Sequence, residues 1–61
     1  MNFAQLRAFA AVATHGGFSA AARAIGVTQP ALTHQVRALE AHYGVTLFLR
    51  QGRRVVVTPL A

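Results

Sequence analysis

The sequence predicts a small, mainly α-helical fold in which three helices precede a two-stranded β-hairpin. Over the first 44 residues the apolar side chains recur at helical spacing, and glycines at positions 16–17, 26 and 44 divide this region into three segments. Beyond Gly44 the sequence changes to short β-branched and aromatic runs on either side of Gln51-Gly52, which is typical of a hairpin. These two patterns predict the order helix, helix, helix, strand, strand.

The first helix is predicted over residues 3–14. Asn2 is suited to cap its amino terminus, and Gln5 stands three residues later, as a capping box requires. The run His15-Gly16-Gly17 ends the helix, because glycine just past the last periodic residue is a stop signal. The apolar positions at helical spacing are Phe3, Leu6, Phe9 or Ala10, and Val12 or Ala13.

The second helix is predicted to be short. Ser19 is its predicted N-cap, the alanine-rich run 20–25 continues it, and Gly26 ends it. A helix of little more than two turns does not persist alone in water, so we expect neighbouring elements to hold it.

The third helix is predicted over residues 30–43, because proline is welcome in the first helical turn and Gly44 follows as a stop. Two starts are open. Thr28 has the better capping side chain, whereas Pro30 at the first helical position makes Gln29 the cap. Four apolar residues form the seam that we assign to the core: Leu32, Val36, Leu39 and Tyr43.

The hairpin is predicted to pair residues 45–49 with residues 54–58, and its loop carries Arg50, Arg53 and Arg54. The short glycine-containing turn between the second and third helices is a helix-turn-helix pattern, which spans about residues 18–37. Three helices and a hairpin make a winged helix-turn-helix domain, which we place at residues 1–58.

Composition limits the possible functions. The 61 residues allow one small domain, with six Arg, no Lys, one acid (Glu40) and a formal net charge of +5. This basic excess favours nucleic acid or an anionic membrane surface as a partner. The lack of Cys excludes disulfides and thiolate metal sites, and the near absence of carboxylates argues against an enzyme.

Size and hydropathy add three further expectations. No apolar run is long enough to span a membrane, and no secretory signal is expected. A core this small is marginally stable alone, so we expect a domain of a longer protein. No cofactor is expected in this domain.

The third helix carries the predicted DNA-reading face. At roughly 100° per residue, its polar and cationic positions fall opposite the apolar seam. Gln29 is suited to pair bidentately with adenine, and Pro30 to contact a thymine methyl group. Thr33 offers a hydroxyl to a base edge or a phosphate, and Arg37 is placed to grip a phosphate. Small residues such as Ala31 let the helix lie close in the major groove, which is about 12 Å wide.

Further contacts are predicted at the start of this helix and in the hairpin. The positive end of the helix dipole gives a weak preference for anions near Thr28. Arg53 and Arg54, with Arg50 beside them, are suited to a phosphate or a narrow minor groove.

Each of these residues has a purely structural alternative. Gln29 also fits a plain helix-start residue, Thr33 and His34 also fit solvated surface groups, and the hairpin arginines also fit a solubilising loop. A metal site would need His15, His34 and His42 to converge. They lie on different elements or faces, so no metal site is expected.

Three blocks of residues form a more specific pattern. The blocks are Phe18-Ser19-x3-Arg23-x3-Val27-Thr28-Gln29-Pro30-Ala31-Leu32-Thr33, then Val36-x2-Leu39-Glu40-x3-Gly44-Val45-x-Leu47-Phe48-x-Arg50, then Gly52-Arg53 with Val57-Thr58. Together with the start of the chain, they resemble the N-terminal DNA-binding domain of LysR-type transcriptional regulators. The resemblance covers essentially the whole chain.

The resemblance implies a bacterial, cytoplasmic regulator in which this domain precedes a linker helix and an effector domain that senses a small molecule. It implies that the partner is double-stranded DNA carrying an inverted repeat. It also implies a homo-oligomer, a dimer or a tetramer, in the full-length protein. Residues 59–61 then correspond to the truncated start of the linker helix.

The family's functional positions carry over residue by residue. Gln29 and Pro30 are then expected to read bases, and Arg53 to serve the wing. Thr33 and His34 are expected on the recognition face, where the family often has Ser followed by Arg.

Two rival functions stay open from the sequence. A cationic membrane-surface peptide fits the charge and the 54% apolar content, and it predicts helices that form only on anionic lipid. A winged helix that binds other proteins and no DNA is the second alternative. Its outward face would tolerate acids, whereas Glu40 is the only acid in this chain.

Overall fold

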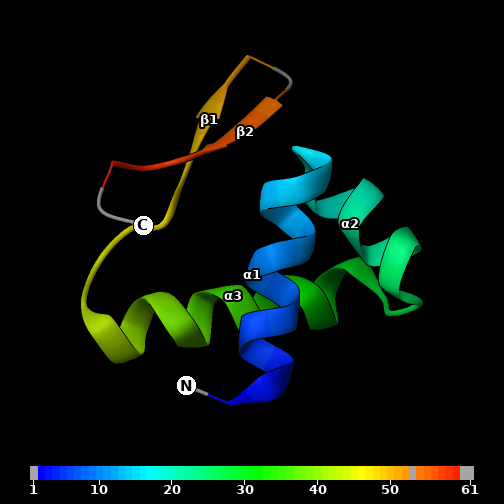
Figure 1. The fold of residues 1–61 in the computed structure, drawn as a ribbon, viewed down its shortest axis with the longest axis horizontal. Coiled ribbons are helices and arrows are strands. Elements are labelled where there is room, and N and C mark those ends of the chain that lie inside the picture. Colours follow the sequence, from blue (N-terminus) through cyan, green and yellow to red (C-terminus); the bar gives the residue numbers. More distant parts are fainter. Residues whose placement is uncertain (1, 53, 60–61) are drawn as a thin grey trace.

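The computed structural model describes residues 2–52 and 54–59 and confirms the predicted element order (Figure 1). Three helices, α1 (Phe3–His15), α2 (Phe18–Ile25) and α3 (Gln29–Tyr43), precede two strands, β1 (Phe48–Gln51) and β2 (Arg54–Val57). The strands form one antiparallel hairpin. Figure 1 shows α1 crossing α3, with α2 beside α1 and the hairpin at the far end of α1 from its amino terminus.

The start of α1 follows its sequence signals closely. The Asn2 side chain accepts a hydrogen bond from the Gln5 backbone N–H at 2.8 Å, and the Gln5 side chain accepts from the Asn2 N–H at 3.3 Å. This reciprocal pair is the predicted capping box, and it satisfies two amide donors that the helix leaves free. Gly16 ends the helix in the left-handed conformation that favours glycine (φ 70°).

The start of α2 differs from the prediction. Gly17, not Ser19, is the N-cap, and Ser19 lies inside the first turn. The carbonyl of Gly17 already accepts the N–H of Ala21 at 3.1 Å, so the helix includes Phe18. The ring of Phe18 then packs edge-on against Phe48 with 6.0 Å between centroids. Tertiary packing therefore begins the helix two residues earlier than capping propensity suggests.

Of the two predicted N-caps of α3, the structure has Thr28. Its hydroxyl accepts a hydrogen bond from the Ala31 N–H at 3.2 Å, and its carbonyl accepts the Leu32 N–H at 3.0 Å. Pro30 is the second helical residue, where a backbone N–H would have no partner within the helix. The third helix therefore spans Gln29–Tyr43 rather than residues 30–43.

The core is small and rich in alanine. Leu32, Val12 and Val36 are the largest side chains with almost no exposed surface. The buried apolar residues are Ala8, Ala11, Val12, Ala21, Ala22, Leu32, Val36, Leu39, Leu47 and Phe48. Alanines on α1 and α2 let the three helices approach closely, so close backbone packing replaces large side chains.

Three residues assigned to apolar seams are exposed instead. Tyr43 is 55% exposed and Phe3 is 77% exposed, and Leu6 is also largely accessible. On α1, the buried Ala8 lies about 160° from Leu6 at roughly 100° per residue, so the stripe of Ala8, Ala11 and Val12 faces the core and Phe3 and Leu6 do not. Tyr43 is the last residue of α3, whose carboxyl end extends past α1 in Figure 1. Its ring packs against His42 with 4.8 Å between centroids.

The hairpin is shorter than the pattern predicted. Residues 45–47 are not part of β1, because the backbone N–H groups of Val45 and Leu47 bond to Glu40 of α3 rather than to a strand. Thr58 lies just past β2 and donates its N–H to the Leu47 carbonyl at 2.8 Å. Within the expected linker-helix start, Pro59 belongs to a turn, and residues 60 and 61 lie outside the described residues.

None of the helices in the described residues combines the length and the apolar character that crossing a membrane requires.

Candidate nucleic-acid interface

The amino-terminal half of α3 exposes the predicted recognition residues while its apolar seam faces inward. Exposed side chains begin at the cap, before the helix, and continue along it: Thr28, Gln29, Pro30, Ala31, His34 and Arg37. Thr33 is partly exposed on the same side. Leu32 and Val36 are each 1% exposed and anchor the opposite face in the core. The helix therefore presents polar, small and cationic groups outward over its first three turns.

Gln29 and Thr33 are joined on this face. The Gln29 amide Nε2 donates a hydrogen bond to the Thr33 hydroxyl oxygen at 3.0 Å, one helical turn away. The amide keeps its carbonyl oxygen and one N–H, which together can still pair with the donor and acceptor of an adenine edge. The hydrogen bond restricts the Gln29 rotamer, so the amide is partly oriented before any ligand arrives.

Strand register separates the hairpin arginines. Arg50 pairs with Val55, and both share the face that carries the buried Phe48. Arg54 pairs with Gln51 and lies on the other face, because successive residues of a strand point to opposite sides. Arg53 lies outside the described residues. Arg50 and Arg54 therefore cannot contact one phosphate from the same side of the sheet.

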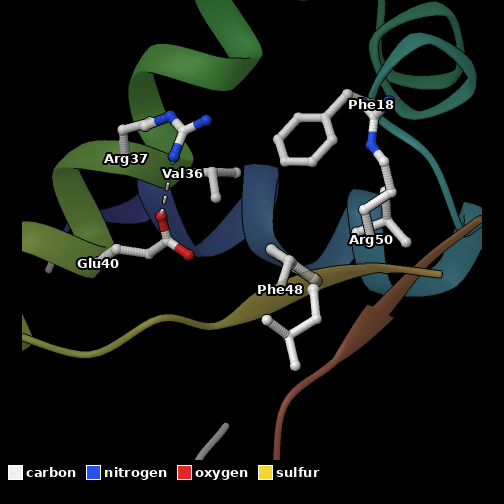
Figure 2. Close-up of a pocket in the computed structure, with 8 residues that line it drawn as sticks. Phe18, Val36, Arg37, Glu40, Phe48 and Arg50 are labelled. Carbon is white, nitrogen blue, oxygen red and sulfur yellow. Dashed lines mark ion pairs between the residues drawn. The ribbon is translucent and has the colours of Figure 1, made fainter.

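Arg50 lies beside the recognition helix. It lines a hollow with Phe18, Arg37 and Glu40, and a second hollow with Gln29 and the start of α2. Figure 2 shows the first hollow, with Arg37 and Glu40 on the α3 side and Phe18 and Arg50 across from them. The fold thus places Arg50 in both hollows, one shared with Arg37 and the other shared with Gln29.

The acid of this region is partly neutralised by its neighbours. Glu40 Oε1 lies 3.9 Å from Arg37 Nη1, and Oε2 accepts the Leu47 backbone N–H at 2.8 Å (Figure 2). The Glu40 side chain is 15% exposed, whereas that of Arg37 is 76% exposed. The carboxylate therefore lies inward and the guanidinium outward, so the surface keeps its basic character.

Two features of the site were not anticipated from the sequence. Ser19, which the sequence predicts only as a helix cap, lines the hollow that also contains Gln29 and Arg50. Glu40 accepts a hydrogen bond from the Leu47 backbone N–H ahead of β1, a contact that the helical spacing of α3 does not indicate. The sequence does offer one signal for Glu40: it is the single acid in a chain with six arginines, which points to a specific structural role.

The histidines lie apart in the chain, at the end of α1, within α3 and at the last turn of α3. Among residues 2–52 and 54–59, no three His, Cys, Asp or Glu side chains gather where they could hold a metal ion.

Comparison with known proteins identifies the kind of domain. The family model described as "Bacterial regulatory helix-turn-helix protein, lysR family" matches residues 3–61. The transcriptional regulator TfdS of Cupriavidus pinatubonensis is 51% identical over 59 residues, which are 97% of this chain and 20% of that protein. A probable hydrogen peroxide-inducible genes activator of Streptomyces viridosporus is 57% identical over 58 residues, 95% of this chain and 19% of that protein.

Solved structures agree with these sequence matches. The crystal structure of the CbnR DBD–DNA complex superposes with a TM-score of 0.91 at 45% identity, over 98% of this chain and 69% of that one. The chain spans about a fifth of the length of the curated relatives it matches.

Proposed function

The chain belongs to the lysR family of bacterial regulatory helix-turn-helix proteins, and we propose that it binds double-stranded DNA sequence-specifically as the N-terminal domain of a transcriptional regulator. The main observation in support of this proposal is the orientation of α3. Its first three turns expose Gln29, His34 and Arg37 while Leu32 and Val36 are buried. The superposition with a chain that was solved as a DNA complex supports DNA as the partner.

In this proposal α3 enters the major groove and the hairpin reaches the adjoining backbone. Gln29 and Pro30 contact bases, and Ala31 allows the close approach. Arg37 and Arg50 bind phosphates, since guanidinium groups suit phosphate oxygens and stand on both sides of the same concave region. Arg53 and Arg54 are proposed to extend this contact along the wing.

The whole protein is proposed to act as a cytoplasmic regulator and not as an enzyme, in line with relatives named as transcriptional regulators. We propose that it assembles as a dimer or tetramer on an inverted-repeat site, through chain that follows residue 61. A small-molecule effector is proposed to bind a further domain. Half-sites are then expected about one helical turn apart, or a multiple of it.

The membrane-surface alternative finds little support. Arginines are distributed over α1, α2, α3 and both strands rather than along one helix face: Arg7, Arg23, Arg37, Arg50 and Arg54. The described helices also pack on a shared core. A lipid-induced peptide predicts neither arrangement.

Selection of bound sites from random duplex DNA tests the proposal. The protein is expected to enrich one short motif with inverted symmetry. Unrelated duplex DNA added as a competitor should displace the protein from non-specific sites but not from the selected motif. Enrichment of no motif, with equal affinity for all duplexes, would contradict sequence-specific recognition. Binding to a protein partner with no affinity for DNA would favour the alternative of an interaction module.

A further inference from the structure

We propose that Glu40 is a positioning residue, which holds the hairpin at a set place beside α3 so that Arg50 and Arg37 can engage the same DNA backbone. This inference rests on the proposed function. It concerns the one acid of the chain, which lies within a surface otherwise suited to phosphate. A negative charge there opposes DNA binding, so a structural role has to account for the residue at this position.

The first step is the contact between Glu40 and the chain that leads into β1. Its Oε2 accepts the Leu47 N–H at 2.8 Å, and the backbone carbonyl of Glu40 accepts the Val45 N–H at 3.1 Å. Leu47 is 8% exposed and directly precedes the first strand residue, Phe48. A hydrogen bond that a backbone amide donates to a partly buried carboxylate is charge-assisted, and it is stronger than a neutral hydrogen bond of the same length.

The second step is that both ends of the hairpin meet at this contact. The Leu47 carbonyl accepts the Thr58 N–H at 2.8 Å, and the Thr58 hydroxyl donates to the Thr46 carbonyl at 2.7 Å. Thr58 is the buried polar residue of the described chain, and it follows β2. Glu40 therefore connects α3 to residue 47, and Thr58 connects residue 47 to the far strand.

The third step is geometric. Each strand has only four residues, and a two-stranded hairpin of that size has little stability of its own. A second attachment, from the Val55 N–H to the Gly16 carbonyl at 3.1 Å, holds β2 against the turn after α1. With Glu40 at one end and Gly16 at the other, the sheet has a defined tilt. Arg50, three residues past Leu47, is thereby held across the hollow from Arg37.

The ion pair between Arg37 and Glu40 is the weakest interaction in this cluster. Arg37 Nη1 stands 3.9 Å from Glu40 Oε1 and is largely exposed, so the pair contributes little and leaves the guanidinium free to move to a phosphate. The backbone contact, and not the ion pair, is therefore the interaction that Glu40 has to provide.

Two substitutions separate the hydrogen bond from the charge. Glu40→Gln keeps an acceptor oxygen for Leu47 and removes the charge, so it should bind the selected site at least as tightly as the unchanged protein. Glu40→Ala leaves the Leu47 amide without its acceptor and should weaken binding about tenfold. Gln35→Ala, on the side of α3 that faces α1, is the matched control and should leave affinity unchanged.

Coupling to the hairpin distinguishes positioning from general stability. Arg50→Ala should weaken binding in the unchanged and Glu40→Gln backgrounds, and it should have a much smaller effect in Glu40→Ala. Affinities are measured below the melting temperature of every variant. An Arg50→Ala penalty that is the same in all three backgrounds, or a Glu40→Gln variant as weak as Glu40→Ala, would overturn the inference.

A spectroscopic measurement keeps the inference separate from the proposed function. The Leu47 amide resonance and its hydrogen-exchange protection should change in Glu40→Ala and be nearly retained in Glu40→Gln. An amide that is indifferent to both substitutions overturns the anchor. Failure of the unchanged protein to bind any duplex, with the Leu47 signature present, would instead reject the DNA-binding role.

Discussion

The side-chain amide of Gln29 donates a 3.0 Å hydrogen bond to the hydroxyl of Thr33, one turn further along the exposed face of α3. The two residues therefore act as a unit, in which Thr33 limits the rotamers of Gln29. Less rotamer freedom remains to be lost when the amide pairs with a base, which favours selective binding.

Gln29→Ala is expected to weaken binding of the selected site by about 1–3 kcal/mol and to remove the preference at one base position. The loss follows from the bidentate pairing that only an amide can make with adenine. Titration of duplexes carrying each base at that position measures it, with Gln35→Ala as the amide control. Unchanged preference between the best site and random DNA would contradict base reading by Gln29.

Thr33→Val removes the acceptor and keeps the shape of the side chain. We expect a smaller loss, about 0.5–1.5 kcal/mol, at the same base position that Gln29→Ala affects. The double variant should lose less than the sum of the two single losses, because the residues share one contact. A uniform loss on all duplexes would show instead that Thr33 binds a phosphate.

Arg37→Ala should weaken binding to every duplex alike. Its guanidinium is 76% exposed and suits a phosphate, which carries no sequence information. The slope of log affinity against log salt concentration should fall by about one. Arg23→Ala, an exposed change on α2, is the control for lost net charge. A loss confined to the selected site would assign Arg37 to a base.

Arg50→Ala and Arg54→Ala should differ, since the two side chains leave opposite faces of the hairpin. Arg50 lines the hollows shared with Gln29 and Arg37, so its loss should lower both affinity and the salt slope by about one phosphate contact. Arg54→Ala should have the smaller effect on both. Equal effects would mean that DNA contacts both faces of the hairpin.

Arg7→Ala should lower the free energy of unfolding by about 0.5–1.5 kcal/mol. Arg7 on α1 donates from Nη2 to the carbonyl of Ile25 at 3.1 Å, at the negative end of α2. Thermal or urea unfolding measures the loss. Arg23→Ala again serves as the control, and an equal change in both variants would leave no special role for the contact.

The sequence by itself determined the local structure of this protein. The caps at Asn2 and Thr28, the stops at Gly16, Gly26 and Gly44, and the turn near Gly52 are decided by residues within about four positions of one another. Those signals placed the helix-turn-helix and the outward face of α3. The same residue pattern also identified the family.

Tertiary structure alone decided which alternatives were realised. On α1 both the stripe of Ala8, Ala11 and Val12 and a stripe with Leu6 satisfy helical spacing, and only the close packing of three helices selects the first. Tyr43 fits the seam of α3 but stands past the end of its neighbours. Strand register places Arg50 and Arg54 on opposite faces of the hairpin. The Glu40 carboxylate accepts its hydrogen bond from Leu47, seven residues away. Such contacts depend on how elements meet in space, which helical or strand periodicity does not encode.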